Sequence, residues 1–339
     1  MNETFGVSPV ISVLLSCYNG ARWLDEAINS VINQTFEDFE FIIVDDGSTD
    51  SSPEIIKHYA EQDARIVVIA KSNTGLADSL NVGLQHARGK WIARLDADDI
   101  CELARLQTQL AKAKTNPDLV FIGAGLLLID ESGTALRAFR YPVSHGLLVR
   151  NLYTSRRFPA HSSAFYRADV VCSIGGYRTR IRRSQDHDLW LRLSEVGQLT
   201  ALDEPLVRIR KHSGQISHDE SGRRQKIDST VAIVSYLLRQ HGSCDPVSAD
   251  EKVFEFFRTW LVDRLDQERF FEFYDYIERV KVSINGMRKS PLSLLSVTRN
   301  IVSEPKFLIR FLWMRLFGES ISRCLADEWI QKDDTCAVL

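Results

Sequence analysis

The first hundred residues alternate between apolar runs of strand length and segments whose apolar residues have helical spacing. Strands are predicted at 10–15, 39–44, 65–69 and 91–95, and helices at 23–31, from Ser52 onward and at 76–87. Strands that alternate with helices form a parallel sheet with right-handed crossover connections. We therefore expect an α/β fold, whose ligands bind beyond the carboxyl ends of the parallel strands.

The pattern changes in the second part of the chain. Apolar segments at 126–130 and 135–141 predict a hairpin, so an antiparallel part joins the sheet, and 188–196 predicts a helix. Beyond about residue 220 the patterns are helical. We therefore expect a mixed sheet flanked by helices over 1–220, and a helical region over 221–339 that makes membrane-interface, acceptor or dimer contacts.

Charge is distributed unevenly along the chain. The net charge of −3 argues against a general nucleic-acid-binding protein, which needs a basic excess. Between Arg137 and Gln185, however, ten arginines stand against one acidic residue, Asp169. Two interpretations are open: a solvated basic face, or a surface for an anionic partner such as a phosphate-bearing acceptor or acidic lipid headgroups.

The cysteines and the apolar runs bear on location. The six cysteines lack CxxC spacing, which argues against zinc, and no signal peptide precedes them, so we expect a reducing, cytoplasmic setting. No apolar run reaches transmembrane length. The run at 307–317 is interrupted by Arg310 and Arg315. It fits either a helix packed against the protein or one lying at the inner face of the plasma membrane.

Three carboxylates lie within four positions, at Asp96, Asp98 and Asp99, directly after the fourth predicted strand. Like charges this close resist ionising together unless a cation or hydrogen-bond donors hold them. A divalent metal that also holds a phosphate accounts for all three carboxylates. The alternative is a turn whose aspartates cap a helix that begins near Cys101, and this accounts for only one of them.

Two other polar segments follow predicted strands, Ser-Cys-Tyr-Asn-Gly at 16–20 and Asp-Asp-Gly-Ser-Thr-Asp at 45–50. Each suits a strand-to-helix turn, and each also offers polar groups to a nucleotide. Asp46 is able to accept from a base N–H or from ribose hydroxyls, as acidic residues near strand ends do in dinucleotide folds. We expect both segments to lie beside the acidic cluster, at one edge of the sheet.

Two later segments hold further candidates. Asp188 is expected as the N-cap or a first-turn acid of the helix that follows it, which leaves Asp186 just ahead of the helix, on a loop, free to act as a general base. His212 follows a cationic stretch at 208–211. It is either structural, a metal ligand together with the acidic cluster, or a contact for a diphosphate.

These motifs resemble those of bacterial family-2 inverting glycosyltransferases, which have the Rossmann-like nucleotide-diphospho-sugar transferase fold known as GT-A. The similarity covers about residues 10–215. It is carried by blocks at 13–19, 34–36, 43–50, 73–83, 96–99, 175–177 and 185–190. Two positions depart from the family pattern: Gln185 stands where many members have Glu, and Leu80 where many have Arg.

The resemblance implies a role for each matched residue. The implied contacts with the donor nucleotide are Ser16, Tyr18, Asp46, Asn73 and Asp96, with Asp46 on the N3–H of a uracil-type base and Asp96 on the ribose. The implied ligands of a Mn²⁺ or Mg²⁺ ion that bridges the diphosphate are Asp98, Asp99 and His212. Asp186 is the implied catalytic base.

The implied activity is transfer, with inversion, of a hexosyl or N-acetylhexosaminyl group from a nucleotide-diphosphate sugar, with UDP-sugars favoured. The acceptor is a hydroxyl of a saccharide or lipid-linked molecule, in surface polysaccharide biosynthesis. One alternative is a sugar nucleotidyltransferase, but residues 12–22 lack its glycine-rich phosphate loop. The other is a non-catalytic nucleotide-sugar-binding protein of the same fold, against which the joint presence of Asp96, Asp98 and Asp186 argues.

Overall fold

A computed structural model describes residues 8–212, 220–267 and 321–336. The chain divides into two compact units, Met1–Ser229 and Thr230–Leu339. Helix α8 (Glu220–Gln240) runs across the boundary between these units. The active-site candidates all lie in the first unit.

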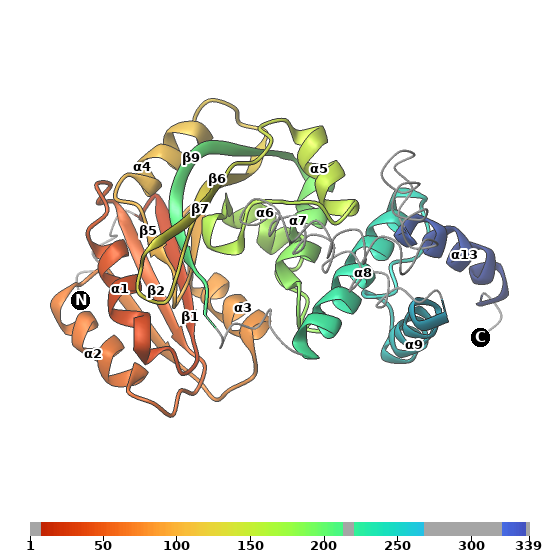
Figure 1. The fold of residues 1–339 in the computed structure, drawn as a ribbon, viewed down its shortest axis with the longest axis horizontal. Helices are drawn as coiled ribbons and strands as arrows, with labels where there is room; N and C mark the ends of the chain where they lie inside the picture. The colour runs from red at the N-terminus through yellow and green to blue at the C-terminus, as the bar shows by residue number, and fades with distance from the viewer. Residues whose placement is uncertain (1–7, 213–219, 268–320, 337–339) are drawn as a thin grey trace, which may run out of the picture. The chain divides into compact units, whose positions relative to one another are not determined.

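The first unit is built on a parallel sheet. Strands β1 (Ile11–Cys17), β2 (Phe39–Asp45), β3 (Ile66–Ala70) and β4 (Trp91–Asp96) are parallel and lie in the order β3-β2-β1-β4. Helices α1 (Ala21–Ile32), α2 (Ser52–Gln62) and α3 (Leu76–His86) connect them (Figure 1). The predicted alternation and the parallel sheet are confirmed.

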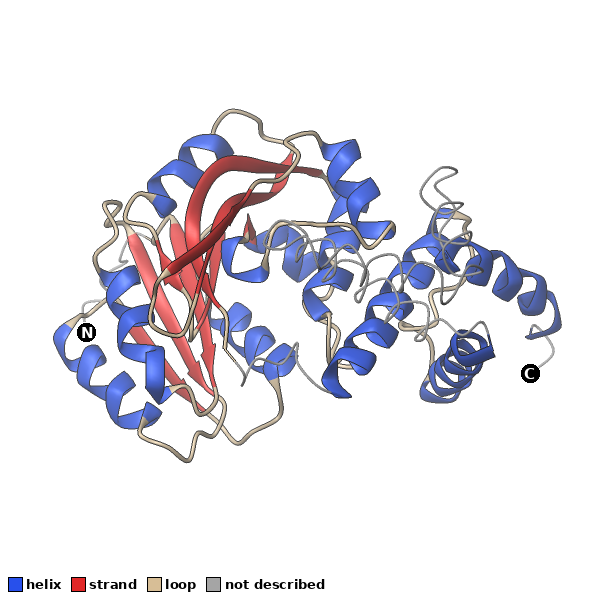
Figure 2. Cartoon of the chain, viewed as in Figure 1, coloured by secondary structure: helices blue, strands red, loops and turns tan. Residues whose placement is uncertain are grey.

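Helices cover both faces of the parallel strands (Figure 2). On one face, Val13 and Leu15 of β1 pack with Leu24 of α1 in the main hydrophobic core. On the opposite face α3 lies so close that a Cβ added at Gly83 would be 2.2 Å from a methyl group of Leu14. Strands buried on both faces have near-continuous apolar sequences, as these do.

Nine strands of the described residues form a single sheet, in which an antiparallel part continues the parallel one. The further strands are β5 (Ile100–Cys101), β6 (Leu119–Ile129), β7 (Ala135–Phe139), β8 (Phe165–Arg167) and β9 (Gln198–Arg210). Strand β8 runs antiparallel to β4 and β6, and β7 forms the predicted hairpin with β6. The long β9 runs parallel to β6, pairs with β5, and arches across the sheet to the ends of the parallel strands (Figure 1).

The prediction that a helix begins near Cys101 is wrong. Ile100 and Cys101 form strand β5, which pairs with Arg208 and Val207 of β9, and helix α4 (Arg105–Ala113) begins later. The N–H of Cys101 also donates to Ser30 Oγ, at 3.0 Å. Both partners come from distant parts of the sequence, so the local pattern does not reveal this strand.

Shorter helical segments of the first unit position the site. They are α5 (His145–Tyr153), the 3-10 helix η1 (His161–Ser163), α6 (Ala168–Ser173) and α7 (Gln185–Val196). Helix α7 follows Ser184, which has a left-handed backbone with φ of 59°. This reversal lets the chain turn sharply into the helix, which therefore begins before the predicted residue 188.

The second unit contains helices α9 (Glu251–Gln267) and α13 (Ile321–Cys336). They pack through aromatic rings: the Trp329 ring centroid lies 4.8 Å from those of both Phe257 and Trp260. No helix among the described residues is long and apolar enough to cross a membrane. The apolar run at 307–317 lies outside the described residues.

Candidate active site

The predicted polar segments meet at the carboxyl ends of the parallel strands. In the sheet register, Ser16 at the end of β1 is paired with Asp96 at the end of β4. The N–H of Asp46, just past β2, donates to the carbonyl oxygen of Cys17 at 2.8 Å. The register therefore places the ends of three strands side by side, as the sequence predicted.

The acidic cluster occupies this edge of the sheet. Asp96, Asp98 and Asp99 each offer a carboxylate oxygen, and these atoms lie within 4.8 Å of one another. Burial, together with the neighbouring carboxylates, raises the pKa of Asp98 and raises that of Asp99 well above its ordinary value. Oxygen ligands in this arrangement, with uncompensated negative charge, fit a hard divalent cation such as Mg²⁺ or Mn²⁺.

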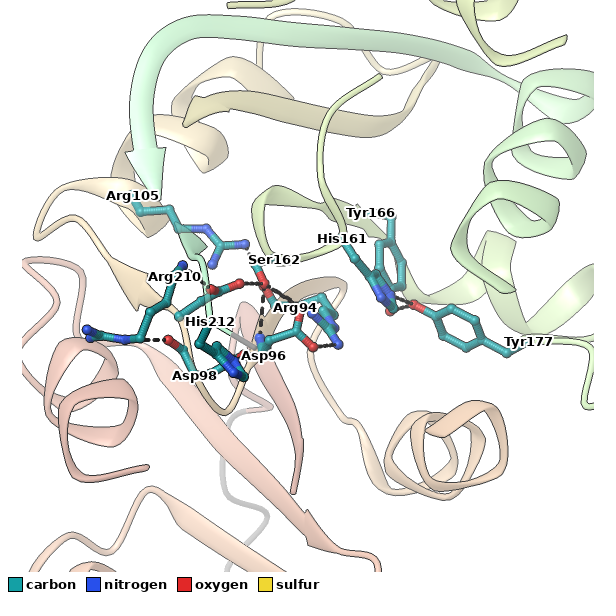
Figure 3. Close-up of polar contacts among 11 residues, drawn as sticks. Arg94, Asp96, Asp98, Arg105, His161, Ser162, Tyr166, Tyr177, Arg210 and His212 are labelled. Carbon is teal, nitrogen blue, oxygen red and sulfur yellow. Dashed lines mark hydrogen bonds and ion pairs between the residues drawn. The ribbon is translucent and has the colours of Figure 1, made fainter. Parts of the chain in front are cut away.

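Asp96 differs from its two neighbours because a cation is already beside it. The guanidinium of Arg94, which is fully buried, forms an ion pair with the Asp96 carboxylate (Figure 3). Burial opposes ionisation of Asp96, but Arg94 holds the pKa of this carboxyl below its ordinary value. The three carboxylates are therefore not equivalent: Arg94 favours the ionised form of Asp96, whereas burial and the neighbouring carboxylates disfavour the ionised forms of Asp98 and Asp99.

His212 lies directly on the acidic cluster (Figure 3). Its Nε2 is 2.8 Å from Asp98 Oδ2, and its ring lies against that of Trp23 at a tilt of 43°, with centroids 4.3 Å apart. Its neighbour Arg210 forms an ion pair with Glu26 at 2.7 Å, and the Arg210 N–H donates to Asp99 Oδ1 at 2.9 Å. Strand β9 thus brings a distant imidazole and a backbone donor to the carboxylates.

Asp46 is buried and already holds several donors. Its oxygens accept from the Lys71 ammonium at 2.6 Å and from the backbone N–H groups of Thr74 and Gly75, at 3.0 and 2.9 Å. Burial opposes its ionisation, but Lys71 and these amides lower the pKa of Asp46. Asp46 therefore fixes the loop that follows β3, a partnership with Lys71 that the sequence did not indicate.

The same loop carries Asn73, which is exposed. The backbone nitrogen of Asn73 would lie 2.8 Å from a Cβ added at Gly47, which has a φ of 75°. Only glycine permits this close approach of the two loops. Across the strand ends, Tyr18 is exposed at 54%, next to Asn19, whose Oδ1 accepts from the Thr49 N–H at 2.8 Å. The predicted donor contacts thus line adjoining loops.

Asp186 lies in the first turn of α7, not on a loop, so that prediction is wrong. Asp188 is an acid of the first turn, one of its two expected places, and not the N-cap; it is fully buried and pairs with Arg192 at 2.8 Å. The helix begins ahead of Asp186, at Gln185, directly after the left-handed Ser184. Burial raises the pKa of Asp186, and the charges of Arg94 and Asp96 both act on it. The candidate base thus lies within electrostatic reach of the acidic cluster.

A buried polar network that the sequence did not reveal lies beside these groups. The Tyr177 hydroxyl is 2.8 Å from His161 Nε2 and 3.0 Å from the Tyr166 hydroxyl (Figure 3). Asn81 of α3 donates through Nδ2 to the Tyr177 carbonyl oxygen at 2.7 Å, and its Oδ1 accepts from the Tyr177 N–H at 2.8 Å. The Gly-Gly-Tyr block that ends at Tyr177 was the one available signal, although it did not indicate these partners.

A mixed sheet with carboxylates at the carboxyl ends of its parallel strands is the arrangement expected for the nucleotide-diphospho-sugar transferase fold. Residues 12–175 match the family model described as Glycosyl transferase family 2. The O-antigen biosynthesis glycosyltransferase WbnJ of Escherichia coli is 32% identical over 208 residues, 60% of this chain and 80% of that protein. The chain belongs to glycosyltransferase family 2.

Solved structures share the fold. TarS of S. aureus in complex with UDP-GlcNAc has a TM-score of 0.54 at 19% identity, over 67% of this chain and 66% of that chain. The mannosyltransferase PcManGT of Pyrobaculum calidifontis, in complex with GDP-Man and Mn²⁺, has a TM-score of 0.51 at 15% identity, over 95% and 84%. At these identities the likeness establishes the fold alone, and this confirms the GT-A expectation.

Proposed function

We propose that the protein transfers a sugar, with inversion, from a nucleotide-diphosphate donor to an acceptor hydroxyl in surface polysaccharide biosynthesis. The observation that carries the proposal is the meeting of three carboxylates at the strand ends, with Asp186 within their electrostatic reach. The nucleotide-sugar ligands of the two structural neighbours and the O-antigen role of WbnJ support it. We favour a UDP-sugar carrying a hexosyl or N-acetylhexosaminyl group.

The donor nucleotide would lie along the loops after β1, β2 and β3. Ser16 and Asp46 would contact the nucleoside, with Tyr18 and Asn73 at the exposed side of the same loops. Asp96, turned by Arg94, would accept from the ribose. Because Asp46 already accepts from Lys71, Thr74 and Gly75, its free lone pairs have a fixed direction, which suits recognition of one base edge.

Asp98, with Asp99 and His212, would hold Mn²⁺ or Mg²⁺. Asp98 is more exposed than Asp99, with 30% of its side chain accessible, and His212 Nε2 already faces it. A cation bound there supplies positive charge against the diphosphate. The PcManGT complex with Mn²⁺ supports this chemistry for the fold.

Asp186 would act as the base. Its carboxylate would take the proton of the acceptor hydroxyl, whose oxygen then bonds to the anomeric carbon. The bond from that carbon to the diphosphate oxygen breaks on the opposite face, and the electron pair leaves with the nucleoside diphosphate. The raised pKa of Asp186 suits a group that must accept a proton near neutral pH.

We expect donor binding to depend on a divalent metal. Titrating UDP-, GDP- and dTDP-sugars into the protein by calorimetry, with Mn²⁺ and then with EDTA, tests this directly. One donor class should bind with Mn²⁺ and lose about tenfold or more in affinity without it, since the cation offsets repulsion between the diphosphate and the carboxylates. If no nucleotide sugar binds with Mn²⁺ or Mg²⁺, the proposed function is wrong.

The basic segment offers a site for an anionic partner. Several of its arginines are neutralised, such as Arg140 by Asp203 at 2.9 Å. Arg137 and Arg157 form no ion pair with a described residue, and both guanidinium groups lie over the Phe139 ring, at 5.1 and 4.5 Å from its centroid. Two like charges held on one ring concentrate positive potential. We propose that this pair contacts anionic lipid headgroups.

Liposome flotation tests the lipid contact. The protein should float with vesicles containing phosphatidylglycerol but not with phosphatidylcholine alone. The double variant Arg137→Gln/Arg157→Gln should lose most of this binding, since each cation near the surface contributes about 1 kcal/mol. Lys57→Gln/Lys114→Gln removes the same charge from other exposed positions and should float as the wild type does. Absence of flotation, or equal loss in both variants, contradicts the lipid contact.

A further inference from the structure

One buried hydroxyl lies between the acidic cluster and its counter-cation. Ser162 Oγ, fully buried, is 2.8 Å from Asp96 Oδ2 and also hydrogen-bonds Asp99 Oδ2. On its other side it accepts from Arg94 Nη1 and from the Asp96 N–H, both at 3.1 Å. Two of the three clustered carboxylates and their guanidinium partner therefore share one side-chain oxygen (Figure 3).

The sheet explains why a hydroxyl stands at this point. Strands β4 and β8 pair only as far as Ala93 and Phe165, after which the Arg94 N–H still donates to the carbonyl oxygen of Ala164 at 3.0 Å. The next outward N–H, that of Asp96, donates to the Ser162 side chain instead. The Ser162 hydroxyl thus accepts the hydrogen bond that a β8 carbonyl oxygen would otherwise accept, at the point where the backbone turns away into η1. This bond connects Asp96, the last residue of β4, to η1.

Side chains of helix α4 hold the backbone around Ser162 in place. Arg105 of α4, fully buried, donates through Nη2 to the carbonyl oxygens of Arg94 and Ala164, at 2.8 and 3.1 Å. Gln109, one turn later, donates to the Ser163 carbonyl oxygen at 2.8 Å. Helix α4 therefore holds η1 against β4 with little freedom, and Ser162 Oγ has a defined position relative to the carboxylates.

We propose that Ser162 is a positioning residue for the metal-binding carboxylates, an inference that rests on the proposed function. A serine has one hydroxyl proton, so Ser162 donates to one of the carboxylates Asp96 and Asp99 at a time while holding both near a single point. It keeps Asp99 turned toward the cluster and Asp96 turned toward Arg94. Groups that orient metal ligands in this way typically change metal affinity by about 10- to 100-fold when they are removed.

Ser162→Ala tests this proposal, and the chain offers a matched control. Ser163 is the next residue of η1 and equally buried, but its Oγ donates to the Ala160 carbonyl oxygen, at 2.8 Å, away from the carboxylates. We expect Ser162→Ala to weaken Mn²⁺ binding, measured by calorimetry without donor, by about tenfold or more, and Ser163→Ala to leave it unchanged. In turnover, the KM for donor should rise in Ser162→Ala and fall back as Mn²⁺ is increased.

A loss of folding alone would not give this dependence on Mn²⁺. Ser162→Cys keeps a donor at the γ position, although a weaker and larger one, so it tests the proposal even if the alanine variant fails to fold, and its Mn²⁺ affinity should lie below that of the wild type. Equal Mn²⁺ affinity in the folded Ser162 variants and in Ser163→Ala overturns the inference while the proposed function stands. If the wild type binds neither Mn²⁺ nor any nucleotide sugar, the proposed function itself is overturned.

Discussion

Asp186→Asn is expected to abolish sugar transfer while donor binding stays close to that of the wild type. The amide has the shape of the carboxylate but cannot take the acceptor proton, so kcat should fall by about 10²- to 10⁴-fold. Asp186 lies in the first turn of α7 and not on the loops that we propose bind the nucleotide, so the Kd for the donor with Mn²⁺ should change by less than about threefold. Single-turnover transfer and calorimetry on the same preparation measure the two quantities.

The pH profile gives an independent check on the base. Because burial raises the pKa of Asp186, activity should fall as pH drops through a value above that of an ordinary aspartate, where the protonated carboxyl can no longer accept a proton. The acid limb should be absent from the residual activity of Asp186→Asn. A variant that loses donor binding together with turnover would show that Asp186 is part of the donor site and not the base.

Asp188→Asn provides the contrast on the same helix. Asp188 is fully buried between Arg192, at 2.8 Å, and Arg178, at 3.5 Å. The substitution breaks the buried ion pair with Arg192, and removing one partner of such a pair typically destabilises a protein by about 3–5 kcal/mol. We expect a lower melting temperature and near-normal activity per folded molecule, the opposite of the result for Asp186→Asn.

Asp98→Asn is expected to remove the stabilisation that Mn²⁺ gives the protein. A ligand at 100 times its Kd stabilises the native state by about 2.7 kcal/mol, so the wild-type melting temperature should rise when Mn²⁺ is added. The variant should show little of this rise, and its donor affinity in Mn²⁺ should approach that of the wild type in EDTA. Differential scanning fluorimetry with and without Mn²⁺ measures the first effect, and calorimetry the second.

Without metal, Asp98→Asn should not lower the melting temperature of the protein. Burial and the Asp96 carboxylate raise the pKa of Asp98, and burial with the Asp98 and Asp96 carboxylates raises that of Asp99, so removing the Asp98 charge relieves repulsion. Asp98→Asn should therefore melt at the same temperature as the metal-free wild type, or higher. Glu131→Gln, which removes an exposed carboxylate paired with Arg22, is the control and should keep the full response to Mn²⁺. If Asp98→Asn keeps that response as well, Asp98 is not a metal ligand.

Several features followed from the sequence because their causes are local. Apolar runs separated by helical spacing fixed the four parallel strands, since each run must be buried on both faces. The order of these elements placed their carboxyl ends at one edge, so Ser16, Asp46 and Asp96 were expected together, and the register of β1 and β4 places Ser16 beside Asp96. The short spacing from Asp96 to Asp99 alone indicated a cation site.

Other features were decided only by tertiary contacts. Cys101 was expected in a helix, but the partners of its backbone lie in β9 and α1. Asp186 was expected on a loop, but the helix begins at Gln185, and inside that helix Asp188 forms a buried pair with Arg192. In both cases the local preference was weaker than a partner that becomes available only when the chain has folded.

The three clustered aspartates show most clearly which features depend on the sequence alone and which depend on the folded structure. The sequence by itself determined that three carboxylates follow β4, because adjacent residues of one strand end cannot be separated. It did not determine that Arg94 compensates Asp96, that His212 faces Asp98, or that Ser162 joins Asp96 to Asp99. Ser162 comes from η1, and His212 from the segment just after the long strand β9. Arg94 and Asp96 lie two residues apart in β4, so their side chains are on the same face of the sheet. Electrostatic interactions depend on distance in space, and only the folded sheet brings these charges within reach of one another.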